Sequence, residues 1–185
     1  MFYFFYLKVV RDGSFSELMS KLGIDMMGRN YIWSLTNSYY RLSPTYMGLG
    51  FEAVDRISKE WYDAGLVQAA FMFHNDILKV FVELGFPGFT VWSLVQYVVY
   101  PVYFNKKFGT EVALCYIALL FYMSFTYMTD NTAFYFWCTM GLRMIPLAYS
   151  FTVKATRKKP PKWTPMLKDE YKNKVAVLLN KSLYE

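Results

Sequence analysis

The sequence is short of the residues that metal sites and many catalytic sites need. It has one histidine, His74, and two cysteines among 185 residues. A zinc site takes three or four ligands, so a single histidine without nearby cysteines argues against one. Cys115 and Cys138 lie in separate apolar segments, where a cysteine acts as a small hydrophobe rather than as half of a disulfide. The chain also lacks a serine nucleophile elbow and a Walker-type phosphate loop. We therefore expect no metal and no cofactor.

Charge is missing from two long stretches. Residues 84–104 (LGFPGFTVWSLVQYVVYPVYF) and 112–129 (VALCYIALLFYMSFTYMT) contain no Asp, Glu, Lys or Arg. Apolar segments of about 18 or more residues are typical of transmembrane helices. A third stretch, 131–153, is long enough to span but carries Arg143 near its middle. Hydrophobic residues make up 55% of the chain and aromatic residues 21%, and a bilayer absorbs such a composition more readily than one soluble core.

These patterns predict an all-α, polytopic membrane protein with four parts. Residues 1–10 form a partial or interfacial membrane helix, because the start is apolar but has no basic region or cleavage site typical of a signal peptide. Residues 11–83 form a helical external loop region. Residues 84–153 form three transmembrane helices, and residues 154–185 form a basic cytoplasmic tail.

The distribution of basic residues sets the orientation. The last 32 residues hold nine Lys or Arg against three acidic residues, a net charge of +6 that equals the charge of the whole chain. The positive-inside rule places this tail in the cytoplasm, together with Lys106 and Lys107. The turn at 129–131 and the segment 11–83 then lie outside. Apolar residues on one face of the tail favour a helix beside anionic membrane lipid over a nucleic-acid-binding segment, for which no motif is present.

The external segment is where chemistry could take place. Its pattern predicts helices at about 30–40, 52–63 and 75–84, with a Pro/Gly loop at 43–51. If Asn75 caps the helix that follows, His74 lies at the positive end of that helix, where neutral imidazole is favoured. A neutral imidazole is what a general base requires. The alternative is a helix-capping or interfacial histidine with no chemical role.

Arg143 is a second polar residue in apolar surroundings. A charge near the middle of a bilayer is costly, so the side chain should face protein, water or a phosphate rather than lipid. Glu111 and Asp130 lie near the ends of the predicted spans and cannot easily reach it. This chain therefore offers no obvious partner, and we expect the partner to come from missing upstream helices or from a lipid diphosphate.

Four short motifs follow one another along the external segment. They are G-R-x-x-x-W at 28–33, P-x-x-x-G-x-G at 44–50, H-N at 74–75 and E-L-G-x-x-G at 83–88. In this order, over about residues 25–92, the chain resembles the O-antigen ligase and O-antigen polymerase family. These are metal-independent membrane glycosyltransferases of bacteria, with a fold that resembles the GT-C class. They act outside the cytoplasmic membrane on glycans linked to undecaprenyl diphosphate.

The resemblance implies a role for each matching residue. His74 would activate the acceptor hydroxyl, and Arg29 would hold the diphosphate of the lipid-linked oligosaccharide donor. Arg41 and Arg56 are further candidates for the diphosphate, since a guanidinium grips phosphate oxygens in two places. The acceptor would be a glycan or a lipid, and ligation and polymerisation both remain open.

The family has around ten or more spans, so the chain resembles its C-terminal half. We expect either a truncated reading frame or one piece of a split protein, in which a partner chain supplies the missing N-terminal helices, and no activity from this chain alone. Two alternatives are a non-catalytic component of a membrane assembly and a component of glycan export.

Overall fold

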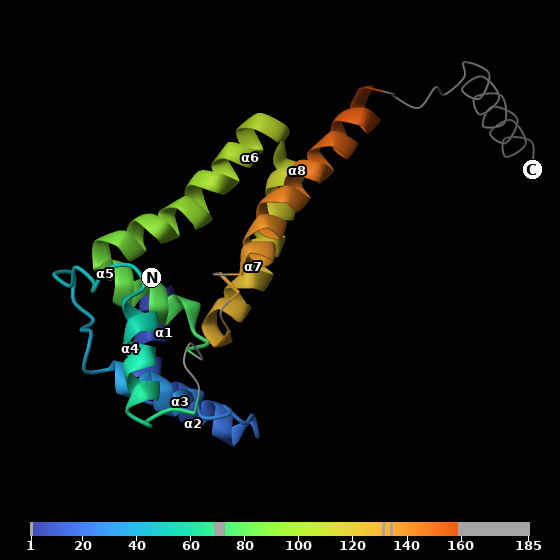
Figure 1. Ribbon diagram of the computed structural model, residues 1–185. Helices are drawn as coiled ribbons and strands as arrows, with labels where there is room; N and C mark the ends of the chain where they lie inside the picture. Colours follow the sequence, from blue (N-terminus) through green and yellow to red (C-terminus); the bar gives the residue numbers. More distant parts are fainter. Residues whose placement is uncertain (1, 69–72, 131, 134, 159–185) are drawn as a thin grey trace, which may run out of the picture. The chain divides into compact units, whose positions relative to one another are not determined.

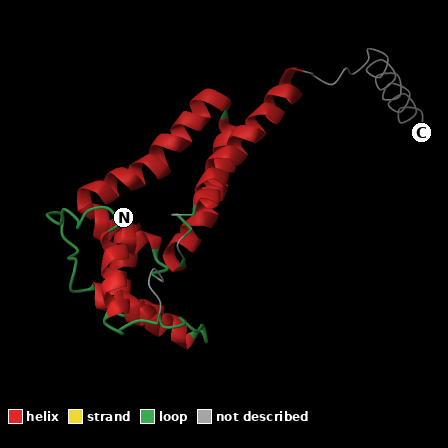
Figure 2. Cartoon of the chain, viewed as in Figure 1, coloured by secondary structure: helices red, strands yellow, loops and turns green. Residues whose placement is uncertain are grey.

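The structure is a computed structural model. It describes residues 2–68, 73–130, 132–133 and 135–158. Every regular element in these ranges is a helix, which confirms the all-α prediction (Figure 2). The chain divides into two compact units, Met1–Pro146 and Leu147–Glu185. The predicted basic tail lies outside the described residues from position 159 onward.

The first helix, α1 (Phe2–Arg11), supplies one face to the core. Its buried side chains fall on a single helical stripe, at Tyr3, Tyr6, Leu7 and Val10. This spacing of three and four residues is that of an amphipathic helix. The stretch predicted as a partial membrane helix is therefore helical and packs against protein along that stripe.

Three short helices follow α1. α2 (Ser14–Lys21) buries none of its residues, whereas α3 (Arg29–Thr36) buries Trp33 and Thr36. A loop without regular structure then leads to α4 (Ala53–Asp63), as the Pro/Gly composition predicts. The buried residues of α4 recur with helical spacing, at Ala53, Val54, Ile57, Ser58 and Trp61. The amphipathic helix expected at about 52–63 is confirmed.

The longest helical stretch runs from residue 76 to residue 108. It consists of α5 (Asp76–Leu94), a π-helical segment η1 (Val95–Val99) and α6 (Tyr100–Phe108). Gly85 interrupts α5 with φ 66 and ψ −172, so the predicted helix at 75–84 and the predicted span at 84–104 meet at a break in the backbone. Pro87 follows the break, where its missing N–H leaves no helical hydrogen bond unmade.

Within the described residues, two helical stretches are long and apolar enough to cross a membrane. They are Asp76–Phe108 and α7 (Thr110–Thr129), and α8 (Phe136–Lys158), the predicted third span, is not one of them. α6 and α7 are joined at Gly109 and pack side by side next to this turn, where Phe104 stacks on Tyr116 with ring centroids 5.0 Å apart (Figure 1). Only 28% of the apolar part of α7 is buried inside the protein.

The Pro/Gly loop is fixed to the break in α5, and we call this contact the loop–kink contact. Leu49 N donates to Val82 O at 3.0 Å and Gly50 N donates to Glu83 O at 2.9 Å, while Phe86 N donates to Tyr46 O at 2.7 Å. A helix that breaks leaves the carbonyls of its last turn without helical donors. The loop supplies these donors, so two of the motifs in the sequence, at 44–50 and 83–88, lie against each other.

The loop–kink contact leaves no room for a side chain at its centre. A Cβ placed on Gly48 would lie 2.4 Å from Glu83 O, and one on Gly85 would lie 2.2 Å from the carbonyl carbon of Met47. Tyr46 adds a hydrogen bond of 2.7 Å from its hydroxyl to Val82 O. Burial raises the pKa of Tyr46 to about 12, so its hydroxyl keeps its proton and donates.

Candidate functional site

The residues 73–76, which we call the His74 junction, lead from the preceding loop into α5. His74 has a left-handed backbone with φ 47, an uncommon conformation for a residue with a side chain. Asn75 is the N-cap of α5, and its side-chain oxygen accepts from Leu78 N at 2.9 Å. The predicted cap is therefore confirmed, and His74 lies next to the N-terminal end of α5.

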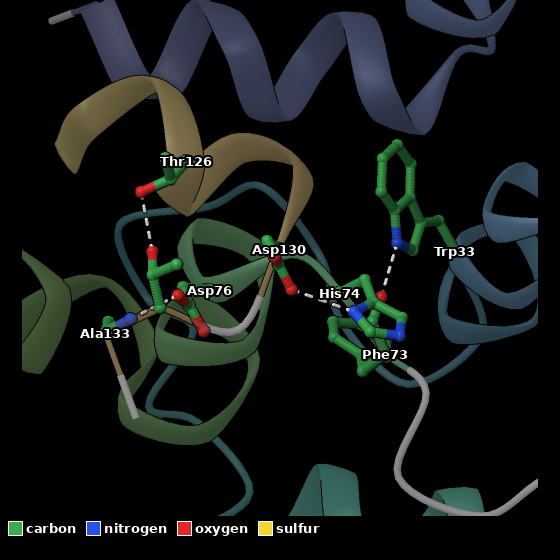
Figure 3. Close-up of polar contacts among 8 residues, drawn as sticks. Trp33, Phe73, His74, Asp76, Thr126, Asp130 and Ala133 are labelled. Atoms are coloured by element: carbon green, nitrogen blue, oxygen red, sulfur yellow. Dashed lines mark hydrogen bonds and ion pairs between the residues drawn. The ribbon is translucent and has the colours of Figure 1, made fainter. Parts of the chain in front are cut away.

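Three helices hold the His74 junction in place. Trp33 of α3 donates from Nε1 to Phe73 O at 2.8 Å (Figure 3). The Asn75 amide, which is fully buried, donates from Nδ2 to the hydroxyl of Tyr6 on α1 at 2.9 Å. That hydroxyl in turn donates to Met128 O near the end of α7. The backbone on both sides of His74 is thus fixed by hydrogen bonds.

The imidazole of His74 is paired with a carboxylate. Nδ1 lies 3.0 Å from Oδ1 of Asp130, the residue that ends α7 (Figure 3). A carboxylate only accepts hydrogen bonds, so this contact places the proton on Nδ1 and leaves the lone pair on Nε2. Nε2 points away from Asp130 in Figure 3 and has no hydrogen-bond partner among the described residues. The His74 side chain is 20% exposed and that of Asp130 is 45% exposed.

A second carboxylate ties the same two segments together. Asp76 is fully buried, and its Oδ2 accepts from Ala133 N at 2.6 Å. Next to Ala133, the hydroxyl of Thr132 lies 2.7 Å from that of Thr126 on α7. His74 and Asp76 therefore both connect the start of α5 to the turn that follows α7.

The structure does not bring the three candidate arginines to His74. Arg29 is the first residue of α3 and is half-buried, whereas Arg41, in the loop after α3, and Arg56, on α4, are exposed. Within the described ranges, none of their guanidinium groups makes a hydrogen bond or ion pair with His74 or with another residue. The segment that leads into Arg29 lines a polar hollow of about 360 Å³, which Asp25, Gly28 and Asn30 border.

Arg143 finds a partner that the sequence analysis did not consider. Its Cζ lies 5.1 Å from the ring centroid of Tyr100, which begins α6. A guanidinium over an aromatic face is a favourable cation–π contact, and more so where water is scarce. Nε of Arg143 is buried and has no hydrogen-bond partner among the described residues. The expectation that this chain offers no partner for Arg143 is wrong.

The part of the chain that the structure describes contains no group of three or more His, Cys, Asp or Glu residues that could hold a metal ion. Cys115 and Cys138 are free and half-buried. The polar groups that do gather are the imidazole, two carboxylates and two threonine hydroxyls at the His74 junction. Such a set can orient and move protons.

Sequence reasoning missed Asp130 as the partner of His74. The two residues are 56 positions apart and both lie outside helix interiors. Apolar periodicity says nothing about which helix ends meet. The available signal was topological, because both residues belong to segments predicted to lie on the same side of the membrane.

Comparisons of the chain with protein-family models, with curated proteins and with solved structures give no match.

Proposed function

We propose that this chain is part of a bacterial membrane glycosyltransferase of the kind that the O-antigen ligase and polymerase family represents. The reaction would transfer a glycan from undecaprenyl diphosphate to a glycan or lipid acceptor, outside the cytoplasmic membrane. The observation that carries the proposal is the pair of His74 and Asp130, which leaves Nε2 of the imidazole available as a base.

The contacts between distant segments support this function. The start of α5 and the turn after α7 must lie on one side of the membrane if both candidate helices span it, and His74 and Asp76 join them there. Hydrogen bonds also link the motifs to one another or to the residue next to one. Trp33 of the first motif bonds to the residue before His74, and the second motif is fixed to the fourth through the loop–kink contact. The ordered motifs therefore build one structural unit.

The chemistry needs one base and a site for the diphosphate. Nε2 of His74 would take the proton of the acceptor hydroxyl as its oxygen attacks the anomeric carbon of the donor sugar. The bond from that carbon to the diphosphate oxygen breaks, and the diphosphate leaves with the electron pair. Asp130 holds the imidazole in the Nδ1–H tautomer and stabilises the imidazolium that forms, as the aspartate of a serine-protease triad does.

Arg29 remains the first candidate for the donor diphosphate. It begins α3, where the positive end of the helix dipole and a guanidinium both favour an anion, although the N–H groups of Arg29 and Tyr31 are bonded to Met26 O and Gly28 O. Arg41 and Arg56 are reserves that are exposed and have no bonded partner among the described residues. Because no guanidinium contacts His74, a substrate or a further chain would have to bring the diphosphate and the imidazole together. A partner chain with additional helices could do so.

The test is glycan transfer in membranes that contain the chain together with any partner chain that activity requires. His74→Ala should lower transfer by a factor of about 10² to 10⁴, the usual contribution of a positioned base. Asp63→Ala, at an exposed position on α4, is the control and should leave transfer unchanged. Transfer within a few-fold of wild type in the His74 variant would remove the proposed base.

A further inference from the structure

The loop between α3 and α4 presents apolar side chains to its surroundings. Residues 42–51 contain no charged residue. Within this loop, Met47 is 72% exposed and Phe51 is 81% exposed, and Leu49 between them is exposed as well. Glycines separate the three. The apolar side chains thus alternate with positions that have no side chain.

This exposure is imposed by the backbone. The loop–kink contact fixes residues 46, 49 and 50 to α5 by main-chain hydrogen bonds, and Gly48 is packed against the backbone of Glu83. Tyr46 is buried, so the loop does send one side chain inward. Met47 and Phe51 cannot follow it without breaking the contact. A fixed loop with exposed apolar side chains is typical of a binding surface.

The position of the loop indicates what it binds. It is attached at Gly85, where the charge-free stretch 84–104 begins; the preceding charged residues, Lys79 and Glu83, are buried in the protein. Figure 1 shows the loop beside the start of this long helical stretch. If the stretch spans a membrane, the loop lies at the level of the headgroups. Aromatic and apolar side chains are enriched at this level.

Charges of both signs flank the loop. The exposed Arg41 precedes it, and the exposed Glu52 follows it directly, before Asp55 and the exposed Arg56 on α4. The two arginines can contact anionic headgroups, but the position of the loop beside the apolar stretch, rather than its flanking charge, indicates the lipid partner.

We propose that residues 42–51 are an interfacial membrane anchor, in which Met47, Leu49 and Phe51 insert among the headgroups and upper acyl chains beside the first span. The anchor rests on the membrane location in the proposed function but not on its chemistry. It would hold the start of α5, and with it the His74 junction, at a fixed depth relative to a lipid-linked substrate.

The test uses single-cysteine variants of the full chain in a background of Cys115→Ser and Cys138→Ser. An environment-sensitive nitrobenzoxadiazole label is placed at Phe51→Cys in the loop. Leu22→Cys, 63% exposed at the end of α2, is the water-facing control, and Leu94→Cys, 51% exposed at the middle of the uncharged stretch, is the bilayer control. The labelled proteins are reconstituted in vesicles of phosphatidylcholine and phosphatidylglycerol.

Lipids that carry a spin label near the headgroup should quench the fluorescence at residue 51 several-fold more than at residue 22. Iodide in the water should quench residue 22 more than residue 51. If iodide quenches residues 51 and 22 alike while deep spin labels quench residue 94, the anchor is wrong and the membrane location stands. If iodide quenches residue 94, the membrane location fails and the anchor fails with it. Protection of residue 51 from both quenchers would show a protein contact, such as a second copy, in place of lipid.

Discussion

Replacing Gly48 by alanine should destabilise the protein more than the same change at Gly50. The two glycines lie in one loop and both have left-handed backbones, with φ 87 and φ 93. A Cβ at Gly48 would meet Glu83 O at 2.4 Å, whereas a Cβ at Gly50 would meet nothing within 4 Å. The pair therefore separates the strain of the backbone from the steric clash at the loop–kink contact.

The magnitudes follow from this geometry. An alanine in the left-handed region costs about 1 to 2 kcal/mol, and Gly50→Ala should lose only this amount. Gly48→Ala must also move the loop away from α5 and weaken three backbone hydrogen bonds, each worth about 0.5 to 1.5 kcal/mol. We expect Gly48→Ala to lose about 3 to 6 kcal/mol of unfolding free energy in total.

The free energy of unfolding can be measured by titrating detergent-solubilised protein with sodium dodecyl sulfate while following helicity by far-ultraviolet circular dichroism. Gly141→Ala is the matched control, because a Cβ there meets only the end of Ile145 at 3.9 Å, and an alanine in a helix is neutral or stabilising. Equal losses at Gly48 and Gly50 would show that the close approach of the loop to α5 does not contribute to stability.

Three further predictions concern charge. Asp130→Asn should lower the kcat of glycan transfer by about 10² to 10⁴ while the KM for the donor stays unchanged, because the amide no longer holds the imidazole tautomer. An unchanged kcat would leave the carboxylate without a role. Lys79→Met breaks the ion pair in which Nζ of the buried Lys79 lies 2.6 Å from the carboxylate of Asp55 on α4. This should cost about 2 to 4 kcal/mol of unfolding free energy. The matched change Lys21→Met removes the exposed ion pair with Glu17 and should leave the unfolding free energy nearly unchanged. Equal losses in the two variants would show that burial does not strengthen the Lys79 pair. In a cysteine-free background, Asp63→Cys should react with a membrane-impermeant thiol reagent on intact cells and Lys106→Cys should not; the opposite pattern would reverse the topology.

Local structure could be predicted where a single segment determines it. The apolar spacing of residues 53–61 defines a buried helical face without reference to any other part of the chain. Asn75 could be identified as a cap because capping depends on a side chain and a backbone N–H three residues later. The break at Gly85 was visible as a Gly/Pro cluster, but not its φ or the loop that packs against it. That contact joins residues more than 30 positions apart.

The candidate site could be predicted only in part, because half of it comes from the end of another helix. His74 stands out in the sequence as the single imidazole, but the choice of Asp130 as its partner depends on how α5 and α7 pack. The same limit applies to Arg143. A search for acidic partners along the chain could not find the ring of Tyr100, since aromatic faces are everywhere in this sequence and only packing selects one.

The conformation of His74 offers a way to separate a catalytic role from a structural one. Asn75 already caps α5, so His74 is not needed as a cap, and its left-handed backbone costs about 1 kcal/mol that a glycine would not incur. Strain that the surrounding contacts maintain is a common property of functional residues.

His74→Gly should therefore relieve the strain while it loses the partly exposed pair with Asp130, which is worth up to about 1 kcal/mol, so the unfolding free energy should stay within about 1 kcal/mol of wild type. His74→Ala keeps the strain and should be the less stable of the two. Glycan transfer should fall by about 10² to 10⁴ in both variants. If glycan transfer survives in His74→Gly, His74 is not the general base. If His74→Gly loses several kcal/mol of unfolding free energy, His74 has a structural role. A folded glycine variant without transfer leaves chemistry as the reason for an imidazole at this position.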